Sequence, residues 1–417
     1  MTAFTRSRAR SWHIWAACLL LTPVACERNA PPQPATPAAT SADAQSSPTA
    51  TAPPASVVAA PPAVASAAPQ VRVPVAPPPV PIPPREPTRT FLDRPEAAGV
   101  FRVVSYNIKW NSIFPAVSKE GAEKFARVFR ALDPDVIGLQ EIGRNPSERD
   151  NPAARTWTAD DVRQLLDQLR PLPGGARWHA YGANSNVIAS KYPLQMTSDR
   201  VRPPGERGPA IALVDLPTPK GPRGLYVVNT HHKCCDGTKN DPRRQVQSDA
   251  IMAWIRDARQ TGGEVDLEDG TGIVILGDFN LVGGQQPLVT LTDGDIVDEQ
   301  RFGADFEPDW DETSLTDAKP MHNIDGSESW TWRDDNQPFE PGRLDFIVYS
   351  DSVLEAVKKF GLNTTAMADE ELEAAGLQRW DVCKDDIGRE YDHLPLVVDF
   401  VYRGVAGAAE APGEEGD

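Results

Sequence analysis

The amino-terminal part of this 417-residue chain lacks the residues that a folded core requires. Its first 97 residues contain no glycine and no lysine, and no aromatic residue occurs between Glu27 and Thr90. The same stretch holds 20 of the chain's 41 prolines. Such a segment cannot bury enough apolar surface to offset the entropy lost on ordering. We therefore expect residues 27–96 to be a Pro/Ala-rich disordered tether, stiffened toward polyproline II.

The apolar run at the amino terminus is too short to cross a bilayer. It extends from Trp12 to Val24, follows three arginines and has the length of a signal-peptide core. It ends at Val24-Ala25-Cys26, which resembles the lipobox of bacterial lipoproteins, although Pro23 stands where an aliphatic residue is usual. Residues 1–26 are therefore predicted to be a lipoprotein-type signal peptide, with lipidation of Cys26 anchoring the chain in a bacterial envelope. Release as a secreted protein is the alternative.

An excess of basic residues is also absent. The net charge is −17, and residues 97–404 carry 50 acidic and 34 basic residues, a net of −16. This excludes a protein that coats nucleic acid non-specifically, although a bound divalent cation can still create a local phosphate site. Residues 405–417 contain four acidic and no basic residues and are predicted to be a disordered acidic tail.

Cysteine is scarce. Cys18 lies in the predicted signal peptide and Cys26 is the proposed lipid site, which leaves Cys234, Cys235 and Cys383. In an oxidising compartment, one of the adjacent pair could form a disulfide with Cys383. A disulfide within the pair and free thiols are the alternatives.

Residues 97–404 are long enough for one large α/β core or two smaller domains. Apolar residues at helical spacing predict helices, and short apolar runs between turn residues predict strands. Because strands outnumber helices and several are consecutive, we expect mixed sheets. The predicted helices are 119–132, 159–169 and about 243–259; the predicted strands are 101–106, 135–140, 178–181, 186–190, 211–216, 225–230, 272–276, 329–333, 344–349 and 394–402.

Polar side chains occur where many of these strands end. Any one of them is more often a turn, cap or structural residue. Together they indicate one polar rim of a sheet. The set is Asn107, Glu141, His231, Asp278, Asn280, Asp345, Asp392 and His393.

The order of these motifs is more specific than any of its members. The chain reads Tyr106-Asn107-Ile108, Leu139-Gln140-Glu141, Asn186 to Pro193, Asn229-Thr-His231, Gly277-Asp278-Phe-Asn280, Arg343-Leu-Asp345 and Asp392-His393-Leu-Pro-Leu. Over residues 101–402 this series resembles the endonuclease/exonuclease/phosphatase superfamily, which has the DNase I-like fold. The resemblance implies a four-layer α/β/β/α sandwich of two packed mixed sheets and one catalytic domain over residues 97–404.

The resemblance also implies a metal-dependent phosphoesterase. Glu141 matches the main metal carboxylate, with Asn107 and Asp392 beside it. Oxygen ligands of this kind suit Mg²⁺ or Mn²⁺. The implied reaction is in-line attack of water on a phosphoester.

The resemblance implies that the other matched residues bind and orient the attacking water and the phosphate. Asp278 and Asn280 would orient the attacking water and polarise phosphoryl oxygens. His393 would act as general base or contact the phosphate, since its ordinary pKa is close to working pH. Asp345 would orient that ring, and His231 would contact the phosphate or protonate the leaving oxygen.

Four further residues have open alternatives. Asn186 and Arg244 are candidate substrate-binding residues, although a turn role for the asparagine and solvent exposure for the arginine are alternatives. Trp330 and Trp332 lie two apart and are predicted to share a strand face, in the core or as a substrate platform.

Two positions narrow the range of substrates that we expect. Relatives of the abasic-site repair type usually have Asp and Lys where this chain has Lys109 and Gly143. We expect a DNase-like nuclease; the alternatives are a sphingomyelinase-like or other phospholipid phosphodiesterase and an esterase of small phosphate compounds. A tethered, inactive binding module on the same fold is the alternative from another class, and the intact set of polar residues opposes it.

Overall fold

The computed structural model describes residues 90–404, apart from residues 149, 236 and 325. The predicted signal peptide, the lipidation site Cys26, most of the tether and the acidic tail lie outside the described residues. In the part of the chain that is described, no helix combines the length and apolar character needed to cross a membrane.

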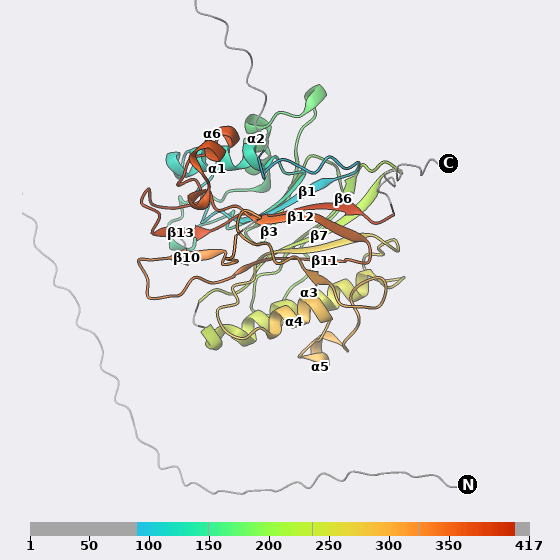
Figure 1. Ribbon diagram of the computed structural model, residues 1–417. Helices are drawn as coiled ribbons and strands as arrows, with labels where there is room; N and C mark the ends of the chain where they lie inside the picture. Colours follow the sequence, from blue (N-terminus) through green and yellow to red (C-terminus); the bar gives the residue numbers. More distant parts are fainter. Residues whose placement is uncertain (1–89, 149, 236, 325, 405–417) are drawn as a thin grey trace, which may run out of the picture. The chain divides into compact units, whose positions relative to one another are not determined.

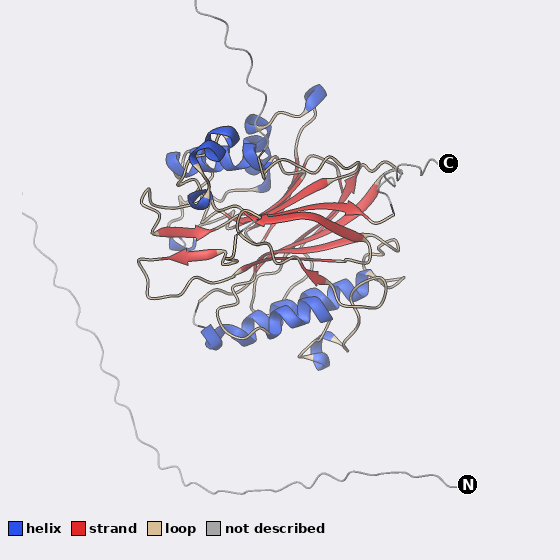
Figure 2. Cartoon of the chain, viewed as in Figure 1, coloured by secondary structure: helices blue, strands red, loops and turns tan. Residues whose placement is uncertain are grey.

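Two six-stranded sheets pack face to face, and helices cover their outer faces (Figure 1, Figure 2). In spatial order the first sheet contains β12 (Leu354–Gly361), β14 (Leu396–Tyr402), β1 (Phe101–Asn107), β2 (Val136–Gln140), β4 (Asn186–Ser190) and β3 (His179–Ala183). The second contains β5 (Leu194–Ser198), β6 (Ala210–Leu216), β7 (Arg223–His231), β8 (Gly272–Asp278), β11 (Asp345–Tyr349) and β9 (Thr316–Asp317). A separate two-stranded sheet pairs β10 (Trp332–Asp334) with β13 (Glu390–His393).

The helices divide between the two outer faces. The first sheet is covered by α1 (Lys119–Leu132), α2 (Ala159–Leu169) and α6 (Asp369–Ala375), and the second by α3 (Asp241–Ala258), α4 (Gln286–Asp293) and α5 (Glu299–Phe302). Strand β1 shows how the layers arise, because Val103 packs between the sheets while its neighbour Val104 packs under the helices. The predicted four-layer α/β/β/α sandwich is confirmed.

Both sheets are mixed, as predicted. Strands β1 and β2 are parallel in the first sheet, and β7 and β8 are parallel in the second. The other pairs in these sheets are antiparallel. Parallel neighbours end at the same edge of a sheet, so each sheet brings two strand ends together at one rim.

Helices α1 and α2 have the predicted bounds because side chains cap them. Ser118 accepts a hydrogen bond from the Gly121 amide at the start of α1, and Thr158 forms a capping box with Asp161 at the start of α2. The structure also contains β5, β12, α4, α5 and α6, which the sequence analysis did not predict. The predicted strand 394–402 corresponds to β14, whereas β13 lies before it and was not predicted; the predicted strand 329–333 contributes only to β10.

The folded domain begins earlier than predicted. Leu92 is buried, and the ring of Phe91 packs edge-on against Phe360. Arg94 forms an ion pair with Asp135. Residues 90–96, which the sequence analysis placed in the tether, therefore belong to the domain.

Candidate active site

The polar residues predicted from strand ends meet at one rim of the sandwich. Asn107 is the last residue of β1, and Glu141 directly follows β2. In the second sheet, His231 and Asp278 end β7 and β8 and are register partners. Asp345 begins β11, which runs antiparallel to β8, so it pairs with Asp278.

A histidine between two carboxylates forms the centre of the site. His393 Nδ1 lies 2.8 Å from Asp345 Oδ2, and His393 Nε2 lies 3.6 Å from Asp278 Oδ2. Thr331 Oγ1 donates a 2.6 Å hydrogen bond to the same Asp345 oxygen. His393, Asp345 and Asp278 are all buried. This network fixes the ring plane of His393 and leaves Nε2 directed toward the other catalytic candidates.

Asn107 links the two sheets within the site. Its Nδ2 lies 3.0 Å from Asp278 Oδ2, 3.3 Å from Glu141 Oε1 and 3.4 Å from His393 Nε2. Its Oδ1 accepts a hydrogen bond from the Lys109 amide. The carboxamide therefore holds the two carboxylates and the imidazole at one point.

His231 approaches the same carboxylates from the second sheet. Its Nε2 lies 3.6 Å from Asp278 Oδ2 and 4.0 Å from Glu141 Oε1. Burial, together with the charges of Arg207 and His393, lowers the pKa of His231 well below its ordinary value. The ring is therefore neutral at neutral pH, which fits a phosphate contact better than proton donation to the leaving oxygen.

The central histidine has the opposite character. Burial would lower the pKa of His393, but the carboxylates of Asp345 and Asp278 outweigh burial and raise it to about 10. Burial raises the pKa of Asp278 to about 7; Asp345 and Glu141 add to this shift and His393 opposes it. At neutral pH His393 is therefore an imidazolium. Of its two implied roles, this supports the phosphate contact over the general base.

Glu141 and Asp392 are the two remaining carboxylates of the predicted set. Burial raises the pKa of Glu141, and the Asp392 charge raises it further. The Asp392 pKa is lowered despite burial, because of Lys384, whose Nζ lies 3.5 Å from Asp392 Oδ2, and because of His393 and Lys109. The two half-buried carboxylates and the carboxamide oxygen of Asn107 are hard ligands, so this group fits Mg²⁺ or Mn²⁺ by donor chemistry.

A second group of metal-ligand type is formed by Asp278, Asp345 and His393, whose ligand atoms all lie within 4.8 Å of one another. Hydrogen bonds and ion pairs already connect these three side chains. The structure therefore offers two groups of metal-ligand type, this one and the predicted set Glu141, Asn107 and Asp392.

The backbone is unusual at several of these residues. Glu141 has φ of 68°, Asn280 of 50° and Asp392 of 61°, all in the left-handed region. Such conformations are costly for residues other than glycine and concentrate at functional sites. They turn each side chain into the site directly after a strand or at its end.

Two cavities meet at His393. The larger has a volume of about 830 Å³ and contains Glu141, His231, Asp278, Asn280 and His393 in its lining. Its remaining described lining is Cys234, Cys235, Gly237, Leu281, Val282, Trp332, Phe339, Glu340, Gly342 and Leu344. No lysine or arginine is among these described residues.

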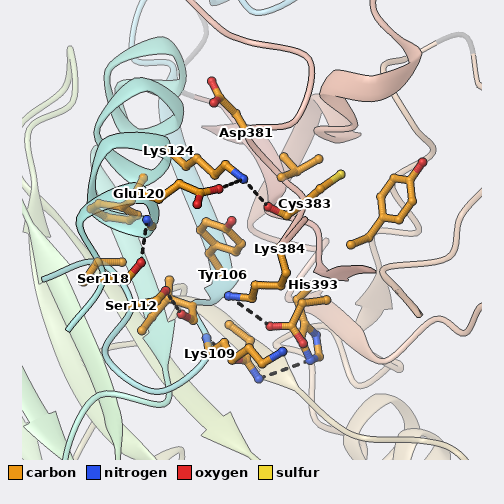
Figure 3. A pocket seen from close by; sticks show the side chains of 18 residues that line it. Tyr106, Lys109, Ser112, Ser118, Glu120, Lys124, Asp381, Cys383, Lys384 and His393 are labelled. Atoms are coloured by element: carbon orange, nitrogen blue, oxygen red, sulfur yellow. Dashed lines mark hydrogen bonds and ion pairs between the residues drawn. The ribbon is translucent and has the colours of Figure 1, made fainter. Parts of the chain in front are cut away.

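The smaller cavity has a volume of about 240 Å³ and shares only His393 with the larger one. Figure 3 shows Lys109, Lys124 and Lys384 around it, with Lys384 directed toward the Asp392 carboxylate. Acidic side chains pair with these lysines, among them Glu390 with Lys109. The smaller cavity is therefore polar but carries little net charge.

The two predicted substrate-binding residues lie apart from both cavity linings. Asn186 is buried at the start of β4, where its Nδ2 donates to the Gly208 carbonyl. Arg244 is fully buried on α3 and donates to the carbonyls of Lys233 and Gly237. The prediction that Arg244 binds substrate, and its alternative as an exposed helix arginine, are both wrong, because it supports the loop behind the cavity.

The predicted disulfide to Cys383 is not present. Cys383 is buried in the smaller cavity, whereas Cys234 and Cys235 line the larger one. The two adjacent sulfur atoms lie 2.7 Å apart. The cysteines that interact are therefore neighbours in sequence.

Two residues of the site were not predicted from the sequence: Thr331, which donates to Asp345, and Phe339, which lines the larger cavity. The paired tryptophans on either side of Thr331 were the available signal. They do not share one role: Trp330 packs against the core and contacts Tyr391, whereas Trp332 lines the cavity with Phe339.

Comparison with known proteins gives one family and several distant structures. Human nocturnin is 16% identical over 73% of this chain and 94% of its own, with a TM-score of 0.42. Truncated TDP2 from Caenorhabditis elegans is 14% identical over 72% and 97%, with a TM-score of 0.42. A Bacteroides vulgatus endonuclease/exonuclease/phosphatase is 14% identical over 73% and 99%, also at 0.42.

No curated protein sequence matches the chain significantly. The model of the endonuclease/exonuclease/phosphatase family matches residues 104–364, which is more than half of the chain and contains all but two of the residues gathered at the rim. Asp392 and His393 lie beyond the match, but they join the same site in space. The chain belongs to the endonuclease/exonuclease/phosphatase family.

Proposed function

We propose that this protein is a metal-dependent phosphodiesterase that works by in-line attack of water. Its family consists of phosphoric ester hydrolases that depend on divalent metals, and this supports an enzyme. The observation that carries the proposal is the buried His393 ring, held between the carboxylates of Asp345 and Asp278, which raise its pKa to about 10. A fixed positive charge is suited to a phosphoryl oxygen that gains charge in the transition state.

The proposed roles follow from these charges. Asp278, whose pKa is raised to about 7, accepts the proton of the attacking water. Asn280 orients that water, and the backbone amide of Asn280 donates to Asp278 Oδ1 at 2.9 Å. Neutral His231 contacts the phosphate. Glu141, Asn107 and Asp392 would hold Mg²⁺ or Mn²⁺, which supplies charge neutralisation and orientation of the phosphate when bound.

The test of the enzyme is hydrolysis of DNA, RNA, sphingomyelin and a chromogenic phosphodiester. We expect activity with Mg²⁺ or Mn²⁺, loss of activity in chelator, and a decrease of roughly 10²-fold or more in His393→Ala. His179→Ala is the matched control, because His179 is exposed on β3. Absence of wild-type cleavage under all metals would disprove the proposal, and equal cleavage by His393→Ala would disprove the role of His393.

DNA is the first substrate that we propose, as the sequence analysis did, but the large cavity favours a second candidate. Its described lining contains no lysine or arginine, and five apolar residues form part of its wall: Leu281, Val282, Trp332, Phe339 and Leu344. Phe339 is 65% exposed. A lipid-like or other compact phosphodiester with an apolar group fits this wall better than an extended polyanion, which needs basic contacts.

The substrate test compares Phe339→Ala with wild type on DNA and on sphingomyelin. If the apolar candidate holds, KM rises for sphingomyelin and changes little for DNA, while the exposed ring leaves stability unaltered. If DNA is the substrate, only DNA is cleaved at a useful rate. Ile387→Ala is the control, because Ile387 is another exposed apolar residue outside both cavity linings.

We further propose that the enzyme works outside the cytoplasm, anchored through lipidated Cys26 or secreted. The support is the arginine-led apolar run and the Val24-Ala25-Cys26 sequence. Metabolic labelling with a fatty-acid analogue tests the anchor, with Cys26→Ser as control. An unlabelled, freely soluble mature protein would contradict anchoring and leave secretion.

A further inference from the structure

The loop after β7 contains the chain's only adjacent cysteines, and it forms part of the catalytic cavity. Cys234 and Cys235 follow His231 by three and four residues, and both line the larger cavity. Cys235 is exposed and Cys234 half-buried. A reagent in solution can therefore reach the pair beside the catalytic groups.

The two sulfur atoms are closer than non-bonded atoms normally come. Sγ of Cys235 lies 2.7 Å from Sγ of Cys234. Non-bonded heavy atoms in contact lie about 3.5–4.0 Å apart, whereas a disulfide bond measures about 2.05 Å. The loop conformation is thus nearer to a bonded pair than to two thiols in ordinary contact.

Three side chains of the neighbouring segment hold this loop in place. Arg244 donates to the carbonyls of Lys233 and Cys235, at 2.9 and 3.4 Å. Asn240 Nδ2 donates to the carbonyls of Cys234 and Cys235, at 3.1 and 2.9 Å.

Gln247 completes the support by accepting from the Lys233 amide at 2.7 Å. All three supporting side chains belong to buried residues. Cys235 has a left-handed backbone, with φ of 68°. A fully buried arginine, Arg244, therefore supports the loop that contains the two cysteines.

We propose that Cys234 and Cys235 form a vicinal disulfide, and that this bond sets the wall of the catalytic cavity. The thiolate of one cysteine attacks a disulfide oxidant such as glutathione disulfide, releasing one thiolate and leaving a mixed disulfide. The second cysteine, having lost its proton, attacks the protein sulfur of that mixed disulfide and releases the other thiolate. The two cysteines are oxidised, the oxidant is reduced to two thiols, and one sulfur–sulfur bond replaces another.

Reduction reverses this step and changes the wall. The two sulfur atoms must separate by about 1.5–2 Å to go from a bond to ordinary contact, which moves the carbonyls that Arg244 and Asn240 hold. The displacement is transmitted to the site, because Asn280 Nδ2 donates to the carbonyl of His232, two residues before Cys234. We therefore expect the oxidised pair to hold the His232 carbonyl, and with it Asn280, more firmly than two thiols would.

The chemical test maps the pair directly in the full chain. Trypsin cleaves after Lys233 and Lys239, so both cysteines fall in one short peptide, residues 234–239. After glutathione disulfide and an alkylating agent, we expect this peptide unalkylated and lighter by two hydrogen atoms. After dithiothreitol it should carry two alkyl groups. Cys235→Ser should lack the bond, whereas the control Cys383→Ser should retain it.

Recovery of a doubly alkylated peptide, a double glutathione adduct or a link to Cys383 after oxidation would overturn the proposal. This readout does not depend on the proposed function, since it needs no substrate. If neither the oxidised nor the reduced form cleaves a phosphodiester, the proposed function is wrong. The peptide masses still show whether Cys234 and Cys235 form a disulfide.

The functional test compares kcat/KM of the oxidised and reduced wild type. We expect reduction to lower it roughly threefold to tenfold, because displacements near 1 Å at a site can cost up to about 10²-fold. Cys235→Ser should show no response to reductant. Equal kcat/KM in both wild-type states would overturn the assignment of the bond to the cavity wall.

Discussion

At the scale of single residues, the site depends on where one proton resides. The two carboxylates that face the ring nitrogens of His393, at 2.8 and 3.6 Å, raise its pKa to about 10 and so favour the protonated ring. Asp345 makes the closer contact and is itself fixed by Thr331. The positive charge of His393 therefore depends mainly on Asp345, a side chain that need not touch the phosphate.

Asp345→Asn should lower kcat by roughly 10²- to 10⁴-fold, since the amide cannot stabilise the imidazolium. We expect the fold to survive, because Asn retains an oxygen that can accept from Thr331. Steady-state kinetics and thermal unfolding measure the two effects. Glu355→Gln, an exposed carboxylate on β12, is the control. A kcat within a few-fold of wild type would contradict the role of Asp345.

The raised pKa of His393 also predicts how stability depends on pH in chelator. A group whose pKa rises from 6.5 to about 10 on folding binds its proton more tightly in the native state. Its contribution is complete below about pH 6.5 and is lost as pH rises toward 10. The difference in unfolding free energy between wild type and His393→Gln, measured by urea denaturation, should therefore shrink over that range. A difference that grows with pH would contradict the assignment.

Whether the role of a site residue could be predicted depends on how far away in sequence its interaction partners lie. Asn107, Glu141, His231 and Asp278 could be identified because each stands at the end of an apolar strand. The charge of His393 could not, because it comes from Asp345, 48 residues away in sequence. The left-handed backbone of Glu141 likewise depends on tertiary contacts, including the Trp110 amide, which donates to Glu141 Oε2.

At the scale of elements, α3 supports the cavity wall through Arg244. Its guanidinium donates to the carbonyls of Lys233 and Gly237 in the loop after β7 and pairs with Asp241 on its own helix. Removing it leaves these acceptors without a donor.

Arg244→Met should destabilise the protein by about 2–4 kcal/mol, since it breaks a buried, hydrogen-bonded charge. Arg243→Met, next to it in α3, is the matched control, because Arg243 is exposed and its pair with Glu206 is worth about 0–1 kcal/mol. Chemical denaturation measures both. If Arg244 bound substrate instead, KM would rise in Arg244→Met with little loss of stability.

The elements that were predicted differ from those missed in the strength of their local signals. Helices α1 and α2 have capping side chains and apolar residues at regular spacing. Strand β12 was missed because a bulge between Ala356 and Lys358 interrupts its alternation. Helices α4 and α6 are only eight and seven residues long, and such short helices owe their stability to packing rather than to sequence.

At the scale of the whole molecule, the domain boundary is a matter of packing. Leu92 and Phe91 bury apolar surface, and Arg94 pairs with Asp135 at the start of the first sheet. We expect a chain that begins at residue 90 to keep the activity of the full protein, because the described residues make up the whole predicted site.

A chain that begins at residue 97 should be less stable by about 2–4 kcal/mol, because burial of one large apolar side chain is worth about 1.5–3 kcal/mol. Thermal and urea unfolding of the two truncated proteins provide the measurement. Equal stability of both would show that residues 90–96 contribute nothing and would restore the predicted boundary.

The division of the site between the sheets has a consequence for folding. Asn107 and Glu141 come from the first sheet, whereas His231, Asp278 and Asp345 come from the second. Neither sheet alone holds both Glu141, the proposed metal ligand, and Asp278, the proposed water-activating carboxylate. Catalysis is therefore a reporter of docking between the sheets: during refolding, hydrolysis should return only after the interface closes, later than the circular dichroism of the strands.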